Sequence, residues 1–145
     1  MLDDISVMLV DDEVPFVETM TKRLAKRNLK VKSAFSGMEA LEKLGEDGAD
    51  TEVVVLDVKM PGMDGIETLQ EIKRQFPLTE VIMLTGHATV SSAIAGMKKG
   101  AYDYLMKPCD IDDLVTKVND AASKKRDHEN KIIEARMKEF MRTKV

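Results

Sequence analysis

Residues 52–76 read EVVVLDVKMPGMDGIETLQEIKRQF, and the change of pattern inside this stretch decides the fold. The first five residues, Glu52 to Leu56, form a short run of Val and Leu that is typical of a strand buried on both faces. After a turn rich in Pro, Gly and Asp, apolar residues recur at spacings of three, three and four, which places them on one helix face: Ile66, Leu69, Ile72 and Phe76. The stretch therefore predicts a strand, a loop and a helix in succession.

The same unit recurs along the whole chain. Four more apolar runs predict strands, at Ile5 to Val10, Lys30 to Ala34, Glu80 to Leu84 and Tyr102 to Met106. Helical periodicity separates them, and Pro15 and Gly100 stand where a first helical turn and a helix end favour proline and glycine. Because parallel strands are joined by right-handed crossover helices, strict alternation predicts an α/β fold with a doubly wound parallel sheet.

Four of the five predicted strands end in polar residues suited to chemistry. The runs lead into Asp11-Asp12, Asp57, Thr85 and Lys107. In a doubly wound sheet, ligands bind beyond the carboxyl ends of the strands, so these side chains should gather at one edge. Each residue alone has an ordinary explanation as a cap or a solvated strand end, but their joint placement predicts a functional site.

Three carboxylates at one edge would repel one another unless a cation lay among them. The set offers oxygen ligands only, which favours Mg²⁺ over zinc, with water completing the octahedron. Asp57 would then be placed as a nucleophile that accepts a phosphoryl group. Lys107 and the hydroxyl of Thr85 would neutralise charge on the phosphoryl oxygens.

Composition limits the alternatives. With 145 residues, 43% hydrophobic and 33% charged, the chain has room for one domain and an appendage. The single cysteine, Cys109, excludes an internal disulfide, and no apolar run is long enough to span a bilayer. The N-terminus also lacks the layout of a signal peptide, so a cytoplasmic location is expected.

The charge is distributed unevenly. Residues 1–122 carry 14 Lys and Arg against 22 Asp and Glu, a net of −8, whereas residues 123–145 carry 8 against 4, a net of +4. The acidic body argues against direct DNA binding by the folded part, because phosphate contacts need clustered Lys and Arg.

From residue 5 to about 122 the chain resembles the receiver domains of two-component response regulators. The motifs that carry the resemblance are Asp11-Asp12, the segment 56–65 (LDVKMPGMDG), Leu84-Thr85-Gly86 and the segment 104–108 (YLMKP). The stretches around Thr85 and Tyr104 look most like receivers of nitrogen-regulation-type, sigma-54-dependent transcriptional activators. The ATPase and DNA-binding domains of those activators have no counterpart in this sequence, so either a stand-alone regulator or a chain that stops after its linker is expected.

The resemblance implies a flavodoxin-like (βα)5 fold with strand order 2-1-3-4-5. It also implies that a sensor histidine kinase or a phosphotransfer protein phosphorylates Asp57, that slow self-catalysed hydrolysis follows, and that the chain is otherwise not an enzyme. Metal ligands would be Asp11, Asp12, Asp57 and the backbone carbonyl of Lys59. Tyr104 would turn inward as Thr85 moves toward the phosphoryl group, which alters the surface of the fourth helix, fifth strand and fifth helix. Lys59 and His87 would tune the lifetime of the phosphoryl group.

The domain is expected over residues 1–122, and a basic helical extension or linker over 123–145. No apolar residue occurs between Ser123 and Lys131, and then helical spacing resumes at Ile132, Ile133, Met137, Phe140 and Met141. Three interpretations stay open: a dimerising helix, an amphipathic segment for a partner or a membrane surface, and a frayed linker. Self-association through the fourth helix, fifth strand and fifth helix is a further possibility.

Two rival functions keep the same fold. One is a constitutive interaction module that does not use the phosphate. The other is a Mg²⁺-dependent phosphohydrolase. Such an enzyme usually needs a second carboxylate, as general acid, two residues after the nucleophile, and this chain has Lys59 there.

Overall fold

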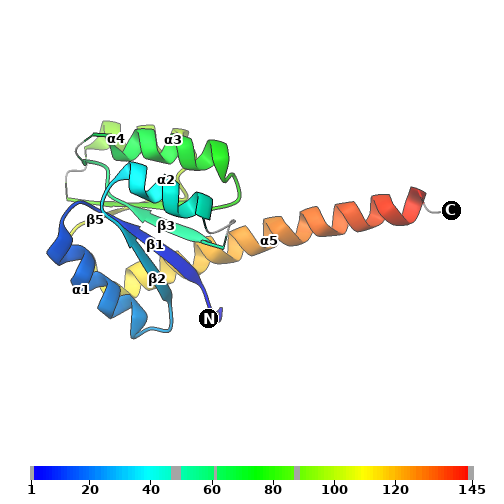
Figure 1. Cartoon of the computed structure of the whole chain (residues 1–145), viewed down its shortest axis with the longest axis horizontal. Helices are drawn as coiled ribbons and strands as arrows, with labels where there is room; N and C mark the ends of the chain where they lie inside the picture. Colours follow the sequence, from blue (N-terminus) through cyan, green and yellow to red (C-terminus); the bar gives the residue numbers. More distant parts are fainter. Residues whose placement is uncertain (1, 47–49, 61, 87–88, 144–145) are drawn as a thin grey trace.

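The computed structural model is a single α/β body from which one long helix projects (Figure 1). It describes residues 2–46, 50–60, 62–86 and 89–143. His87, Pro61 and the last two residues of the predicted extension, 144–145, therefore lie outside the described residues.

Five strands form one parallel sheet in the order β2-β1-β3-β4-β5, which confirms the predicted topology. The strands are β1 (Ser6–Val10), β2 (Lys30–Ala34), β3 (Val53–Leu56), β4 (Glu80–Thr85) and β5 (Asp103–Met106). They differ from the predicted ranges by no more than one residue at either end. The central strands β1, β3 and β4 are buried along their whole length, which explains their continuous apolar runs.

Helices cover both faces of the sheet. They are α1 (Val14–Ala25), α2 (Gly37–Glu46), α3 (Gly65–Gln75), α4 (Val90–Lys98) and α5 (Ile111–Thr143). Figure 1 shows α1 and α5 on one face and α2, α3 and α4 on the other. Two buried clusters correspond to the two faces: one joins the sheet to α1 and α5, and the other joins it to α2 and α3.

Glycines allow two turns in the body. Gly100 follows α4 with φ +103°, the left-handed conformation predicted for a residue that closes a helix. Gly65 opens α3, and a Cβ there would lie 2.1 Å from the carbonyl oxygen of Asp57. The start of α3 thus lies so close to the end of β3 that only glycine fits at position 65.

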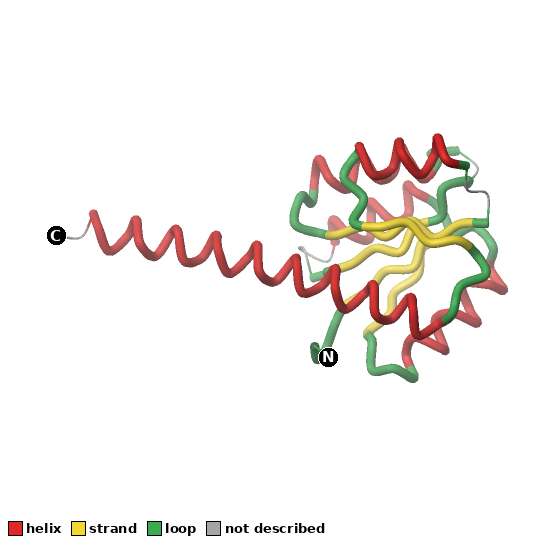
Figure 2. Tube along the Cα trace, turned by 180° about the vertical axis from the view of Figure 1, so that it is seen from behind, coloured by secondary structure: helices red, strands yellow, loops and turns green. Residues whose placement is uncertain are grey.

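The predicted gap in helical periodicity does not interrupt α5, which is one helix of 33 residues, about 50 Å long at 1.5 Å per residue. Figure 2 shows it lying against the body and then continuing past it. None of the helices in the described part of the chain combines the length and hydropathy that a bilayer crossing requires.

Candidate functional site

The predicted site residues follow neighbouring strands at the carboxyl edge of the sheet. The backbone N–H of Asp57 donates to the carbonyl of Val10 (3.0 Å), and the N–H of Lys107 donates to the carbonyl of Thr85 (2.9 Å). These bonds extend the sheet ladder by one step beyond the strands. They therefore fix the positions of Asp57 and Lys107 relative to the neighbouring strand ends.

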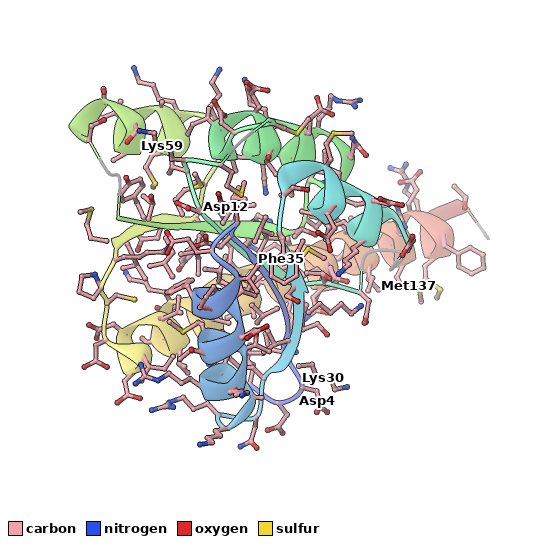
Figure 3. All side chains as sticks on the ribbon, turned by 60° about the vertical axis from the view of Figure 1, so that its left-hand side comes forward. Asp4, Asp12, Lys30, Phe35, Lys59 and Met137 are labelled. Atoms are coloured by element: carbon pink, nitrogen blue, oxygen red, sulfur yellow. The ribbon has the colours of Figure 1, made fainter. Side chains whose placement is uncertain are left out.

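Three carboxylates meet at this edge. One carboxylate oxygen each from Asp11, Asp12 and Asp57 lies within 4.8 Å of the other two. Asp11 and Asp57 are buried, whereas Asp12 is exposed on the loop that leads into α1, where Figure 3 labels it. The structure thus brings together all three predicted side-chain ligands.

Lys107 already partly neutralises this cluster. Its Nζ donates to Oδ2 of Asp11 at 2.5 Å and lies 3.7 Å from Oε1 of Glu13. It also lies 4.0 Å from the centre of the Phe16 ring, a cation–π contact. Neither Glu13 nor Phe16 was assigned to the site from the sequence, although Glu13 directly follows the acidic pair and Phe16 stands four residues after Asp12.

The pKa directions at the site reflect burial first and neighbouring charges second. Burial raises the pKa of Asp11, and repulsion from Asp57 raises it further. The hydrogen bonds from Lys107 and from the Glu13 N–H lower it, but they do not cancel the rise. For Lys107, burial opposes the charged form, but the hydrogen bond to Asp11 and the charges of Asp11, Asp57 and Glu13 outweigh it and raise its pKa. The site thus favours an additional cation.

Asp57 carries the clearest sign of a missing partner. Its side chain is 2% exposed, and its Oδ1 is buried without a hydrogen-bond partner among the described residues. An orphaned carboxylate oxygen is costly unless something else binds it. A hard divalent cation shared with Asp11 and Asp12 fits this donor set, which consists only of oxygens.

Thr85 ends β4 at the site, and Tyr104 on the neighbouring strand β5 contacts α4. Thr85 is fully buried at the end of β4, and Met83 two residues earlier pairs in register with Tyr104 on β5. Tyr104 is half-buried, and its hydroxyl lies 3.5 Å from that of Ser92, which belongs to the capping box of α4. The capping box links Ser92 to Thr89 on both sides.

Lys59 lies two residues beyond Asp57 in the loop after β3, and its side chain is exposed (Figure 3). It offers no second carboxylate at the position that a phosphohydrolase of this type would use. The peptide bond between Lys107 and Pro108 is cis.

Comparisons with known proteins agree with this geometry. Residues 7–119 match the family model described as response regulator receiver domain. The chain is 34% identical over 138 residues to the transcriptional regulatory protein ZraR of Klebsiella oxytoca, covering 95% of this chain and 31% of that protein. It is 38% identical over 117 residues to the DNA-binding transcriptional regulator NtrC of Escherichia coli K12, covering 81% and 24%. The chain thus spans a third or less of the length of these curated relatives.

Solved structures of receiver domains are also similar to this chain. A response regulator receiver domain protein from Clostridium thermocellum is 35% identical with a TM-score of 0.80, covering 84% of this chain and 97% of that one. The receiver domain of NtrX from Brucella abortus is 30% identical with a TM-score of 0.75, covering 81% and 98%. The predicted likeness to receivers of nitrogen-regulation-type activators is confirmed.

Proposed function

Because the chain belongs to the response regulator receiver domain family, we propose that Asp57 accepts a phosphoryl group from the phosphohistidine of a histidine kinase or a phosphotransfer protein, with Mg²⁺ bound at the acidic cluster. The observation that carries the proposal is the buried Oδ1 of Asp57, which has no hydrogen-bond partner among the described residues although Asp57 shares the acidic cluster with Asp11 and Asp12. A carboxylate in that position is poised for a bond that the resting chain does not supply.

Each residue has a specific role in the transfer. A carboxylate oxygen of Asp57 attacks the phosphorus in line, the phosphorus–nitrogen bond breaks, and the imidazole leaves with the electron pair, which gives an acyl phosphate. Lys107 exchanges its contact with Asp11 for a phosphoryl oxygen, and the Thr85 hydroxyl donates to another. Attack by water on phosphorus later returns the carboxylate and inorganic phosphate.

Asp11, Asp12, Asp57 and the backbone carbonyl of Lys59 would hold the metal ion. When bound, Mg²⁺ offsets the negative charge that accumulates on the phosphoryl oxygens in the transition state. Lys59 and His87 tune the hydrolysis rate.

The switch passes from the site to an outer surface. The new charge of about −1.5 to −2 draws Thr85 inward, and Tyr104 follows into the space that is freed. The hydroxyl of Tyr104 then leaves Ser92, so α4 and β5 change their outer face. This α4-β5-α5 surface controls binding of a partner in a transcriptional or other signal response. A second copy of the chain could bind at the same surface or at the extension of α5.

Intact-mass analysis tests the proposal. The wild-type chain, incubated with Mg²⁺ and phosphoramidate, a donor with a phosphorus–nitrogen bond like phosphohistidine, should gain the mass of one phosphoryl group. Asp57→Asn and a sample with EDTA should gain none, whereas Asp50→Asn, an exposed carboxylate outside the site, should react like wild type. An unmodified wild type, or equal labelling of Asp57→Asn, would contradict the proposal and favour a constitutive interaction module.

A further inference from the structure

The projecting part of α5 exposes a concentrated apolar stripe. Five of the eleven exposed large hydrophobic side chains in the described part of the chain lie within ten residues of each other. They are Ile132, Ile133, Met137, Phe140 and Met141, between 38% and 62% exposed. Single exposed apolar residues are common, but a contiguous set marks an interaction site.

The stripe faces the same side of α5 as the body does. Eighteen residues make five full turns of an α-helix, so residues 18 apart point in the same direction. Ile133 stands 18 residues after Val115 and Phe140 stands 18 after Ala122, and both earlier residues are buried against the sheet. The face that packs on the body thus continues outward as the stripe, and Met137, labelled in Figure 3, lies along it.

A groove begins where the stripe meets the body. Two hollows of about 350 and 200 Å³ lie between α5 and the loop that connects α3 to β4, and both are lined by Leu78 and Glu129. The first also includes Pro77 from the loop, and the second includes Ile132 and Ile133 from the helix. We call this continuous depression the Leu78 groove.

We propose that a second copy of this chain covers the stripe, with the two α5 extensions antiparallel and Phe140 and Met141 of each copy seated in the Leu78 groove of the other. Five half-exposed side chains of this size would bury roughly 500 Å² per copy, or about 1,000 Å² for the pair, at the lower end of specific interfaces. The dimer is therefore weak and reversible.

The position of the body selects the antiparallel arrangement. Each body lies on the stripe side of its own helix. In a parallel, in-register pair the two bodies would therefore occupy the same space between the helices and clash. In the antiparallel pair, each body lies beyond the C-terminal end of the other helix, and that end reaches the Leu78 groove. The same geometry opposes a flat membrane, because the body protrudes on the side from which a bilayer would approach the stripe.

Sedimentation over a concentration series tests the association. Wild type should pass from the monomer mass of 16.2 kDa to twice that value. Phe140→Asp and Leu78→Asp should each weaken the dimer at least ten-fold, whereas Met38→Asp, an equally exposed methionine on α2, should not. Thermal unfolding of each variant shows whether it is folded, and Phe140→Asp changes only an exposed residue.

Three results would overturn the proposal. One is a wild type that stays monomeric throughout the series. Another is a dimer that survives Phe140→Asp but is lost in Ile94→Asp on α4, which would assign it to the α4-β5-α5 surface. The third is a monomer that binds anionic phospholipid vesicles through the stripe.

Disulfide trapping tests the orientation. In a Cys109→Ser background, a chain with Leu78→Cys is mixed with one carrying Phe140→Cys under mild oxidation. The mixed disulfide should form at least ten-fold faster than the disulfide of Phe140→Cys with itself, because the antiparallel pair separates the two copies of position 140. Faster formation of the disulfide between two copies of Phe140→Cys would support parallel helices and contradict the inference.

This inference specifies the self-association that the proposed function leaves open, but it does not need phosphorylation. Asp57→Asn should dimerise like wild type, even though it takes no phosphoryl group. Failure of the dimer and failure of the phosphorylation are thus observed separately.

Discussion

Lys107 has two roles at the acidic site that oppose each other. As a cation it stabilises the cluster in the resting chain through Asp11, and in the proposed transfer it is also the group that a phosphoryl oxygen recruits. While it holds Asp11 Oδ2, it binds a carboxylate that the proposed metal ion also needs. The resting contact therefore competes with metal binding but keeps the lysine within reach of the reaction.

Lys107→Met should separate these two roles. Loss of the ammonium group frees Asp11 and removes a positive charge, so Mg²⁺ should bind tighter by about 1 kcal/mol, several-fold in affinity. Phosphorylation by phosphoramidate should fall by roughly 10²-fold, because a donor to the transition-state charge is lost. Calorimetric titration with Mg²⁺ and intact-mass kinetics measure the two effects. Weaker Mg²⁺ binding in the variant would show that Lys107 does not compete with the ion.

Gly65 supports Asp57 through the backbone. In Gly65→Ala the new Cβ would lie 2.1 Å from the Asp57 carbonyl oxygen and 2.5 Å from Cα of Val58, so the strand end must move. We expect a loss of about 2–4 kcal/mol in the free energy of unfolding and slower phosphorylation. Gly45→Ala, where a Cβ meets nothing within 4 Å on helix α2, should instead be stabilising by about 0.5–1 kcal/mol. Urea unfolding compares the two, and equal effects would refute the steric argument.

At the scale of elements, the three central strands could be predicted from the sequence because burial on both faces leaves a run of mostly apolar residues. The same rule placed Asp57, Thr85 and Lys107 at one edge, since parallel strands all end there. Contacts between side chains far apart in the chain could not be predicted this way. Phe16 under Lys107 and Ser92 beside Tyr104 depend on how α1 and α4 pack, which a single periodic pattern does not specify.

The polar turn of α5 shows the same limit. The run Lys124-Lys125-Arg126 is typical in sequence of a solvated basic turn. In the structure, however, Lys125 is 7% exposed, and the other two side chains reach carboxylates at the amino edge of the sheet. Arg126 pairs with Glu52 at 2.7 Å, and Lys124 lies 3.4 Å from the buried Glu80. The apolar periodicity stops here because ion pairs replace apolar contacts, and the helix continues.

Arg126→Met should reveal this contact through its pH dependence. Burial opposes the charged form of Glu52, but the hydrogen bond and charge of Arg126 outweigh it and lower its pKa. The stabilisation is thus fully present above the unfolded pKa of about 4.3 and is lost as pH falls through the lower folded pKa. The variant should be less stable than wild type by about 1–2 kcal/mol at pH 7, allowing for partial exposure, and the difference should shrink in acid.

Arg142→Met is the matched control on the same helix. Arg142 forms an exposed pair with Glu139 at 2.6 Å, so its loss should change stability by less than about 0.5 kcal/mol at any pH. Urea unfolding at several pH values compares the two variants. A difference for Arg126→Met that does not vary with pH would mean that the pair with Glu52 is not its cause.

For the whole molecule, the two edges of the sheet have separate tasks. The carboxyl edge gathers the acidic cluster and Lys107, whereas the amino edge gathers Glu52 and Glu80, which anchor α5. Lys73 also reaches Glu80, so α3 and α5 are joined through one buried carboxylate. The proposed phosphorylation site therefore lies at one edge of the sheet, and the contacts that hold the projecting helix lie at the other.

The two edges predict different results for two truncated chains. We propose that the folded unit extends past residue 122 to include the basic turn of α5. A chain of residues 1–131 keeps Lys124 and Arg126, so its free energy of unfolding should stay within about 0.5 kcal/mol of the full chain, although it loses the stripe and should be monomeric. A chain of residues 1–122 leaves Glu52 without Arg126 and Glu80 without Lys124, and should lose roughly 2 kcal/mol or more at pH 7.

Urea unfolding and phosphoramidate labelling measure both chains. The shorter one should regain part of its stability relative to the longer one as pH falls and Glu52 becomes protonated. Its labelling rate, under conditions where it is folded, should match that of the full chain, because the acidic cluster lies at the opposite edge. Equal stability of the two truncated chains would place the end of the folded unit at residue 122, as expected from the sequence alone, and would leave the basic turn without a structural role.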